Sequence, residues 1–249
     1  MKISKNHPRY ESLKYRYMLV RGLKKGYVTQ SGLISHGRGE AFDYLLGEKT
    51  VPEALHAERA AVALLLSSKN PVISVNGNTA ALCPRDLVRL AEALNARMEV
   101  NLYYRTAKRE KLIERILKKN GAKEVYGVGT KSGKIVPGLY SERARVDPEG
   151  IWSSDTVLVP LEDGDRAESL AAMGKKVVSI DLNPLSRTTR TASISIVDNV
   201  VRAVPNMIKI AEELKVLDKK RLQSIVSGFD NPGNLEKIVR LVRAGCLSE

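Results

Sequence analysis

The chain has 249 residues, enough for one large α/β domain or two small ones, and its 43% hydrophobic and 28% charged residues are ordinary for a soluble globular protein. Its longest apolar run, at residues 60–66, is far too short to cross a membrane, and the N-terminus lacks an apolar signal-peptide core. Cys83 and Cys246 share no metal or redox spacing, so we expect a reduced, cytoplasmic protein.

The N-terminal part, residues 1–70, is predicted to be helical. Apolar side chains recur at helical spacing in residues 8–26 and again in residues 52–70. Residues 31–48 between them are mixed, because two glycines flank Arg38 before a helical stretch begins. We therefore expect an N-terminal helical segment in front of the rest of the fold.

From residue 71 onward, short apolar runs alternate with helical patterns. This alternation predicts a Rossmann-like three-layer α/β core at residues 71–215, with a mostly parallel sheet covered by helices on both faces. C-terminal helices at residues 216–249 complete a single α/β domain, 1–249. The expected strands are 71–76, 98–104, 124–128, 155–162, 176–183 and 193–198, the helices are 83–95, 109–122, 165–174 and 199–215, and residues 129–150 are read as a loop.

The net charge of +13 points to an anionic partner, such as nucleic acid or a phosphorylated metabolite. A well-solvated surface explains the charge equally well, since many of the cations lie in helical patterns such as residues 105–122. Aromatic residues are few, so stacking platforms for single-stranded nucleic acid are not evident.

Polar side chains are concentrated just after the expected strand 176–183. Ligands of open parallel sheets bind outside the carboxyl ends of the strands. Asp181 there can accept hydrogen bonds from ribose hydroxyls, Asn183 suits a base or a ribose, and Arg187 and Thr188 suit phosphate. The alternative is a solvated loop whose side chains form turns.

Residues 75–82 form a strand-to-helix turn around Gly77. The turn lacks GxGxxG, which leaves an NAD-linked oxidoreductase poorly supported, and the chain contains no P-loop. Asn76, Asn78 and Thr79 can present donors to an anion at the helix N-terminus. With equal weight, Asn78 or Thr79 simply caps the helix.

Arg38 stands between Gly37 and Gly39. Glycine allows a close approach to a ligand and arginine gives a forked contact to phosphate, whereas the alternative is a flexible turn with a solvated arginine. His36 beside it can be a catalytic base, but we favour a structural or solvated histidine.

Three acidic residues, Glu162, Asp163 and Asp165, follow another strand and suit magnesium or a substrate ammonium. For Asp165 we favour a helix cap, because Asp165 and Glu168 have the spacing of a capping box. The role of Asp163 stays open. No HExxH motif, nucleophile elbow or paired cysteine is present, so hydrolase chemistry has no support.

Several long segments together resemble one family. HPRYESLKYR, GLISHGRGEAFDYLLGE, PVISVNGNTAAL, EVNLYYRT, VPLEDGDRAE, DLNPLSRT and SISIVDN are similar, in order and nearly end to end, to the archaeal phosphopantothenate synthetases, also called 4-phosphopantoate–β-alanine ligases. The resemblance implies an ATP-dependent homodimeric ligase of coenzyme A biosynthesis that acts through an acyl adenylate. It implies 4-phosphopantoate and β-alanine as substrates, ATP with Mg2+, and neither a nucleic-acid nor a membrane partner. A basic nucleic-acid-binding module is the alternative.

The resemblance also implies a set of site residues. Arg38 and Arg187 are the expected catalytic residues, and no residue is assigned as a metal ligand, so the question of magnesium at Asp163 stays open. By similarity, the ATP contacts are Arg16, Arg38, Asp181, Leu182, Asn183, Arg187, Thr188, Asn199 and Val200.

Overall fold

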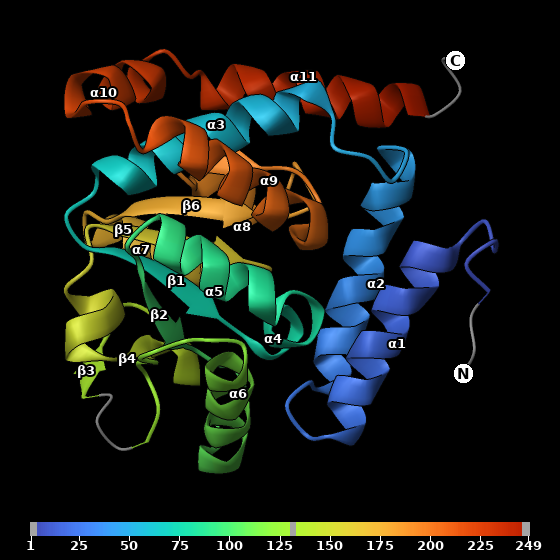
Figure 1. Ribbon diagram of the computed structural model, residues 1–249, viewed down its shortest axis with the longest axis vertical. Coiled ribbons are helices and arrows are strands. Elements are labelled where there is room, and N and C mark those ends of the chain that lie inside the picture. Colours follow the sequence, from blue (N-terminus) through green and yellow to red (C-terminus); the bar gives the residue numbers. More distant parts are fainter. Residues whose placement is uncertain (1–3, 130–132, 246–249) are drawn as a thin grey trace.

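The computed structural model describes residues 4–129 and 133–245. Its centre is a five-stranded parallel sheet with the strand order β2-β1-β5-β6-β7 (Figure 1). The strands are β1 (Pro71–Val75), β2 (Arg97–Val100), β5 (Thr156–Pro160), β6 (Lys176–Ile180) and β7 (Ile194–Ile196). The predicted Rossmann-like α/β core with a mostly parallel sheet is therefore confirmed.

Both faces of the sheet are buried, which explains why its strands are continuous apolar runs. Val157 and Val177 are paired neighbours on β5 and β6 and belong to one core cluster, whereas Leu158 and Val178 belong to another on the opposite face. One face packs against α3, α5 and α9, and the other against α7 and the segment around residues 144–152. These elements are α3 (Pro52–Ser67), α5 (Pro84–Ala93), α7 (Gly164–Ala172), α9 (Val200–Leu214) and η2 (Pro148–Trp152).

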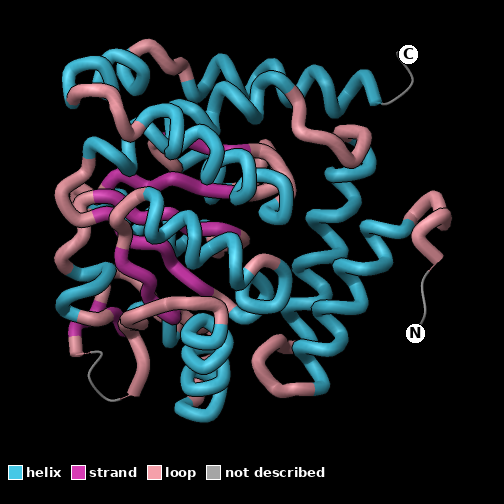
Figure 2. Tube along the Cα trace, viewed as in Figure 1, coloured by secondary structure: helices cyan, strands magenta, loops and turns pink. Residues whose placement is uncertain are grey.

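The predicted N-terminal helical segment is present. Helices α1 (Tyr10–Lys24) and α2 (Gln30–Leu45) run side by side at one end of the sheet, on the right in Figures 1 and 2. Helix α2 continues without a break through Gly37 and Gly39, so the alternative of a flexible turn around Arg38 was wrong. At the C-terminus, α10 (Lys219–Ser227) and α11 (Asn231–Ala244) lie over α3.

Three local predictions differ from the structure. The expected strand at residues 124–128 is a single bridge between Tyr126 and Glu99, because Gly127 adopts a φ of 74° and turns the chain away. The strand expected at 98–104 ends at Val100. Residues 129–150, read as a loop, include a short hairpin and a 3-10 turn in their described part. These elements are β3 (Lys134–Ile135), η1 (Glu142–Ala144) and β4 (Arg145–Val146).

Helix α6 (Ala107–Lys119) packs its apolar face, including Ile113 and Leu117, against the larger core cluster. Cys83 is buried as a free thiol, and Cys246 lies outside the described residues. Of the helices in the described ranges, none combines the length and the apolar character needed to cross a bilayer.

Candidate active site

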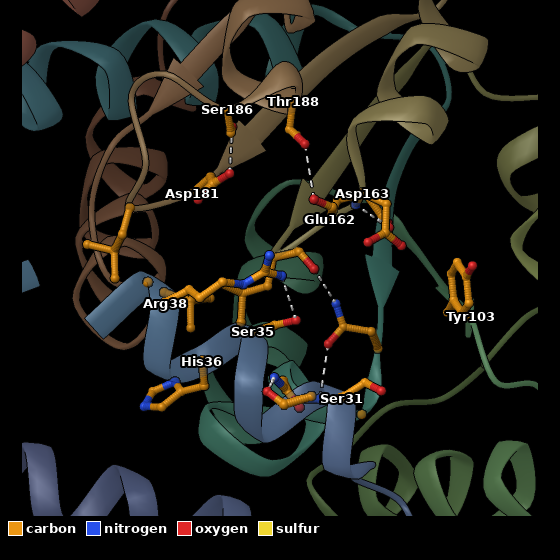
Figure 3. Close-up of a pocket in the computed structure, with 18 of the residues that line it drawn as sticks. Ser31, Ser35, His36, Arg38, Tyr103, Glu162, Asp163, Asp181, Ser186 and Thr188 are labelled. Carbon is orange, nitrogen blue, oxygen red and sulfur yellow. Dashed lines mark hydrogen bonds between the residues drawn. The ribbon is translucent and has the colours of Figure 1, made fainter. Parts of the chain in front are cut away.

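A cavity of about 840 Å³ opens at the carboxyl ends of the parallel strands. It is lined by segments that follow all five strands and by helix α2 (Figure 3). The chain runs from β1 to β2 on one side and then returns to β5 on the other side of β1, so the cavity lies where open sheets bind ligands. The lining residues that follow the strands include Asn76, Tyr103, Asp163, Asp181 and Asn199.

Asp181 directly follows β6 and faces this cavity. Its carboxylate accepts the backbone N–H of Asn183 at 3.0 Å and the hydroxyl of Ser186 at 2.7 Å. Burial raises the pKa of Asp181, while these hydrogen bonds and the charge of Arg38 oppose the rise. The turn of the alternative interpretation is therefore present, and it fixes a carboxylate that retains lone pairs for a ligand hydroxyl.

A five-residue helix, α8 (Arg187–Thr191), begins inside the polar stretch and was not predicted, because so short an element has no periodicity to read. Thr188 Oγ1 donates to the carbonyl of Glu162 at 3.0 Å. The guanidinium of Arg187 lies against Glu168, with Nη2 2.5 Å from Oε2 and Nε 3.0 Å from Oε1. To bind a phosphate, Arg187 must therefore give up at least part of its exposed ion pair with Glu168.

Arg38 extends from α2 into the middle of the cavity (Figure 3). Its Nη2 donates to Ser35 Oγ at 3.3 Å, and the side chain is exposed. His36 also lines the cavity, but Figure 3 shows its ring directed away from Arg38. Burial lowers the pKa of His36, which favours the neutral ring. Of these two residues, Arg38 is the one placed to meet an anion.

Asn76 is the N-cap of α4 (Gly77–Leu82). Its side chain accepts the N–H groups of Asn78 and Thr79 at 3.0 Å, and Thr79 Oγ1 accepts the Asn76 N–H in return. The capping interpretation was right, but the capping side chain is Asn76. Asn78 Nδ2 instead donates to the carbonyl of Gly32 at 2.8 Å and joins α4 to α2.

The acidic loop after β5 is held by two arginines. Glu162 is almost completely buried between Arg143, whose Nη1 lies 2.6 Å from Oε1, and Arg166, which bonds to Oε2. Asp163 Oδ2 lies 2.9 Å from Nε of the same Arg143. Burial raises the pKa of Asp163, and Arg143 counteracts this rise.

The predicted capping box in this loop was wrong. The N-cap position of α7 is Asp163, and Asp165 lies in the first turn of the helix. Glu168 points to Arg187 and not back to the helix start. The spacing fits a capping box, but the helix begins two residues earlier than the pattern requires.

Two arginines of the cavity lining, Arg109 and Arg143, were missed by sequence reasoning. Arg109 donates to the carbonyl of Tyr27 at 2.9 Å and to that of Tyr104. Burial lowers the pKa of Arg109, and within the described ranges no carboxylate forms an ion pair with it. Neither arginine carries a sequence signal that separates it from its many basic neighbours.

Eight of the nine ATP contacts expected by similarity line this one cavity. They are Arg38, Asp181, Leu182, Asn183, Arg187, Thr188, Asn199 and Val200. Arg16 is not among the lining residues: its Nε lies 2.9 Å from Glu40 Oε2, and its Nη2 donates to the Tyr44 hydroxyl at 3.0 Å. Asn199 is the N-cap of α9 and accepts the Val201 N–H at 3.3 Å.

Comparisons with known proteins identify the family. Residues 53–245 match phosphopantothenate/pantothenate synthetase. A relative from Thermococcus onnurineus named 4-phosphopantoate–β-alanine ligase is 52% identical over 243 residues, which cover 98% of this chain and 93% of the relative. A relative of the same name from Methanosarcina mazei is 52% identical over 237 residues, which cover 95% of this chain and 92% of the relative. Another, from Methanospirillum hungatei, is 45% identical over 246 residues, which cover 99% of this chain and 98% of the relative. A nucleic-acid-binding module finds no support here, and the chain belongs to the phosphopantothenate/pantothenate synthetase family.

Proposed function

We propose that this protein joins 4-phosphopantoate to β-alanine in an ATP-dependent reaction of coenzyme A biosynthesis. The observation that carries the proposal is 52% identity, over 98% of the chain, to a relative named for that ligation. The products would be 4′-phosphopantothenate, AMP and pyrophosphate. A cavity at the carboxyl ends of the strands that contains several arginines is consistent with two phosphorylated substrates.

We place the nucleoside of ATP beside Asp181 and Asn183. Asn183 Oδ1 accepts the Leu185 N–H at 2.9 Å, an arrangement that orients its amide donors. Leu182 and Val200 supply apolar surface for the base. The first-turn N–H groups of α9, behind Asn199, suit a phosphate oxygen. Thr188 and Arg187 would contact phosphates from α8, and Arg16 would have to leave Glu40 to take part.

We place the phosphate of 4-phosphopantoate near Arg109, which lies beside Tyr104. Tyr104 packs against Tyr103, and Figure 3 places Tyr103 across the cavity from Asp181. A half-buried guanidinium whose described partners are carbonyls gains most from a bound anion. The two phosphorylated substrates would then enter from opposite sides and meet near Arg38.

The proposed chemistry has two steps. A carboxylate oxygen of phosphopantoate attacks the α-phosphorus of ATP, and pyrophosphate leaves. The amine of β-alanine then attacks the acyl carbon, and AMP leaves with the electrons of the broken C–O bond. Arg38 would lower the repulsion between the two anions, so that positioning and charge neutralisation supply most of the catalysis.

Magnesium fits this site as a nucleotide-bound ion. In the part of the chain that the structure describes, no group of three His, Cys, Asp or Glu side chains is arranged to hold a metal. Magnesium usually keeps several waters and phosphate oxygens, so it needs no cage of protein ligands. When bound, it would neutralise phosphate charge.

We also propose that the chain acts as one domain and as a homodimer. Residues from α2 and from the sheet line the same cavity, which supports a single unit. Tyr17, Val20 and Ile34 on α1 and α2 are exposed apolar side chains that a partner subunit would cover. Sedimentation equilibrium tests the dimer.

An isotope experiment tests the reaction. 4-Phosphopantoate labelled with oxygen-18 in its carboxylate should transfer one label to AMP when ATP and β-alanine are present. Label in inorganic phosphate, with ADP as the product, would reject the adenylate route. Absence of any ligation, with duplex DNA binding that falls steeply with salt, would favour the nucleic-acid alternative instead.

A further inference from the structure

Within the described residues, three carboxylates line the cavity, and their surroundings differ. Glu162 is enclosed by Arg143 and Arg166, with 1% of its side chain exposed. Asp181 is held by the turn that follows β6. The side chain of Asp163 is 46% exposed, and Figure 3 shows its carboxylate directed into the cavity. Asp163 is therefore the carboxylate of this set that a ligand can reach most easily.

The backbone around Asp163 turns this carboxylate toward the cavity at some cost. Asp163 occupies the N-cap position of α7, where aspartate normally accepts a helix N–H, yet its side chain makes no such bond. Two residues earlier, Leu161 has a φ of 54°, a left-handed conformation that is uncommon for a branched residue. An N-cap residue that makes no capping hydrogen bond, close to a strained backbone conformation, is typical of a side chain placed for function.

The charge of Asp163 indicates the kind of ligand. An exposed carboxylate repels the phosphates of ATP and phosphopantoate, so it serves neither of them. β-Alanine, by contrast, brings an ammonium group. Arg143 Nε, 2.9 Å from Asp163 Oδ2, disfavours a divalent cation at this carboxylate more strongly than a monovalent one.

We propose that Asp163 binds the ammonium group of β-alanine and accepts one of its protons, an inference that rests on the proposed ligase function. In this step the ammonium transfers a proton to the Asp163 carboxylate, and the freed amine attacks the acyl carbon of the adenylate. A C–N bond forms, the C–O bond to AMP breaks, and a second proton passes to solvent as the amide forms. AMP leaves with the electron pair of the broken bond.

The charged neighbours of Asp163 suit this role. Burial raises its pKa, the cations Arg143 and Arg166 lower it, and the carboxylates Glu162 and Asp165 raise it. The net shift is upward, which makes the carboxylate a better proton acceptor than an ordinary surface aspartate.

The test compares Asp163→Asn with Asp86→Asn, the same change on α5, outside the cavity lining. Three rates are measured: ATP–pyrophosphate exchange with 4-phosphopantoate alone, hydroxamate formation with hydroxylamine, and ligation of β-alanine. Hydroxylamine is uncharged at neutral pH and needs no proton acceptor before it attacks. In Asp163→Asn we expect kcat/KM for β-alanine to fall about 100-fold, the scale of general-base catalysis. The other two rates should stay at the wild-type value, and Asp86→Asn should retain all three.

Other outcomes overturn the proposal. If exchange falls together with ligation, or if added magnesium restores the rate, Asp163 serves adenylation or a metal. Unchanged β-alanine ligation removes Asp163 from the reaction. If Asp163→Asn does not fold, the wild-type pH profiles decide: once each rate is corrected for the fraction of its nucleophile that is uncharged, β-alanine transfer should lose more rate in acid than hydroxylamine transfer does, and identical corrected profiles reject the role. Wild-type protein that shows no exchange with 4-phosphopantoate would reject the ligase function itself.

Discussion

Arg202 on α9 joins two carboxylates from distant parts of the chain: its Nη2 lies 2.5 Å from Oδ1 of Asp43 on α2 and 2.6 Å from Oδ1 of Asp198 after β7. Asp43 also accepts from Asn199 Nδ2 at 2.8 Å. One arginine thus fastens α2, which carries Arg38, to the first turn of α9 at the cavity.

Replacing Arg202 with methionine should destabilise the fold. The substitution leaves Asp43 and Asp198, both buried, without their counter-ion. Breaking a buried pair in this way costs about 3–5 kcal/mol, and the partial exposure of Arg202 places our expectation at about 3 kcal/mol. Urea denaturation measures the change. The control is Arg221→Met, because Arg221 forms an exposed pair with Asp218, and it should alter stability by no more than about 0.5 kcal/mol. Equal unfolding midpoints for both variants would contradict the argument.

Glu58 on α3, beside this cluster, should make stability fall with rising pH. Burial, and then the charge of Asp198, raise the pKa of Glu58 from 4.5 to about 9. Between these values the unfolded chain has released the proton while the folded protein keeps it, so stability is lost as pH rises. In this pH range, the titration of Glu58 should lower the free energy of unfolding of the wild type by up to about 1.4 kcal/mol per pH unit, and Glu58→Gln should abolish this contribution.

Urea titrations of the Glu58→Gln variant and the wild type at pH 6 and pH 8 measure this difference. Glu236→Gln, at an exposed position on α11, is the control and should follow the wild type. Parallel pH dependence for Glu58→Gln and wild type would show that Glu58 titrates normally.

The position of the cavity was predictable, because it follows from one rule of parallel sheets. Polar residues after a buried strand, beginning at Asp181, lie at the sheet edge where ligands bind. Arg109 and Arg143 were not predictable, since nothing local distinguishes them and only tertiary packing brings α6 and η1 to the cavity.

Helix α2 shows why local signals fail. Glycine disfavours a helix by about 1 kcal/mol relative to alanine, so Gly37 and Gly39 left the residues around Arg38 without a clear helical pattern. The helix forms nonetheless, and at Gly32 an added Cβ would lie 2.5 Å from Asn78 Oδ1, so the close contact of α2 with α4 requires a glycine there. The positions of Gly37 and Gly39 have room for a Cβ, so packing does not require glycine at either one, and sequence alone does not distinguish them from Gly32.

Arg38→Ala should damage catalysis far more than stability. Its side chain is exposed on α2 and reaches into the cavity, so the fold loses little when it is removed. We expect a loss of transition-state stabilisation of about 3 kcal/mol, as for other single donors to developing charge. Steady-state kcat/KM and thermal melting measure the two effects. Arg240→Ala, an exposed change on α11, should leave both unchanged. Wild-type turnover in Arg38→Ala would remove Arg38 from the reaction.

Asp181→Asn should weaken nucleotide binding and leave the fold intact. An amide of the same size keeps an acceptor for the Asn183 N–H but loses the charge that favours ribose hydroxyl donors. Hydrogen bonds to a charged group are worth about 1.5–3 kcal/mol, so affinity should fall roughly 10-fold or more. Isothermal titration with an unreactive ATP analogue measures it, with Asp86→Asn on α5 as the control. Unchanged affinity would place the nucleoside elsewhere.

Gly164→Ala should weaken nucleotide binding through packing alone. A Cβ on Gly164 would lie 2.4 Å from Cβ of Arg187 and 3.4 Å from the backbone nitrogen of Thr188, so α7 and α8 must separate. Overpacking of this kind costs about 1–3 kcal/mol and moves both candidate phosphate contacts. Gly37→Ala is the matched control: nothing lies within 4 Å of its added Cβ, and alanine should stabilise α2 by up to about 1 kcal/mol. Urea denaturation and titration with the ATP analogue measure both variants. If Gly164→Ala binds the analogue as tightly as Gly37→Ala does, the position of α8 does not control nucleotide binding.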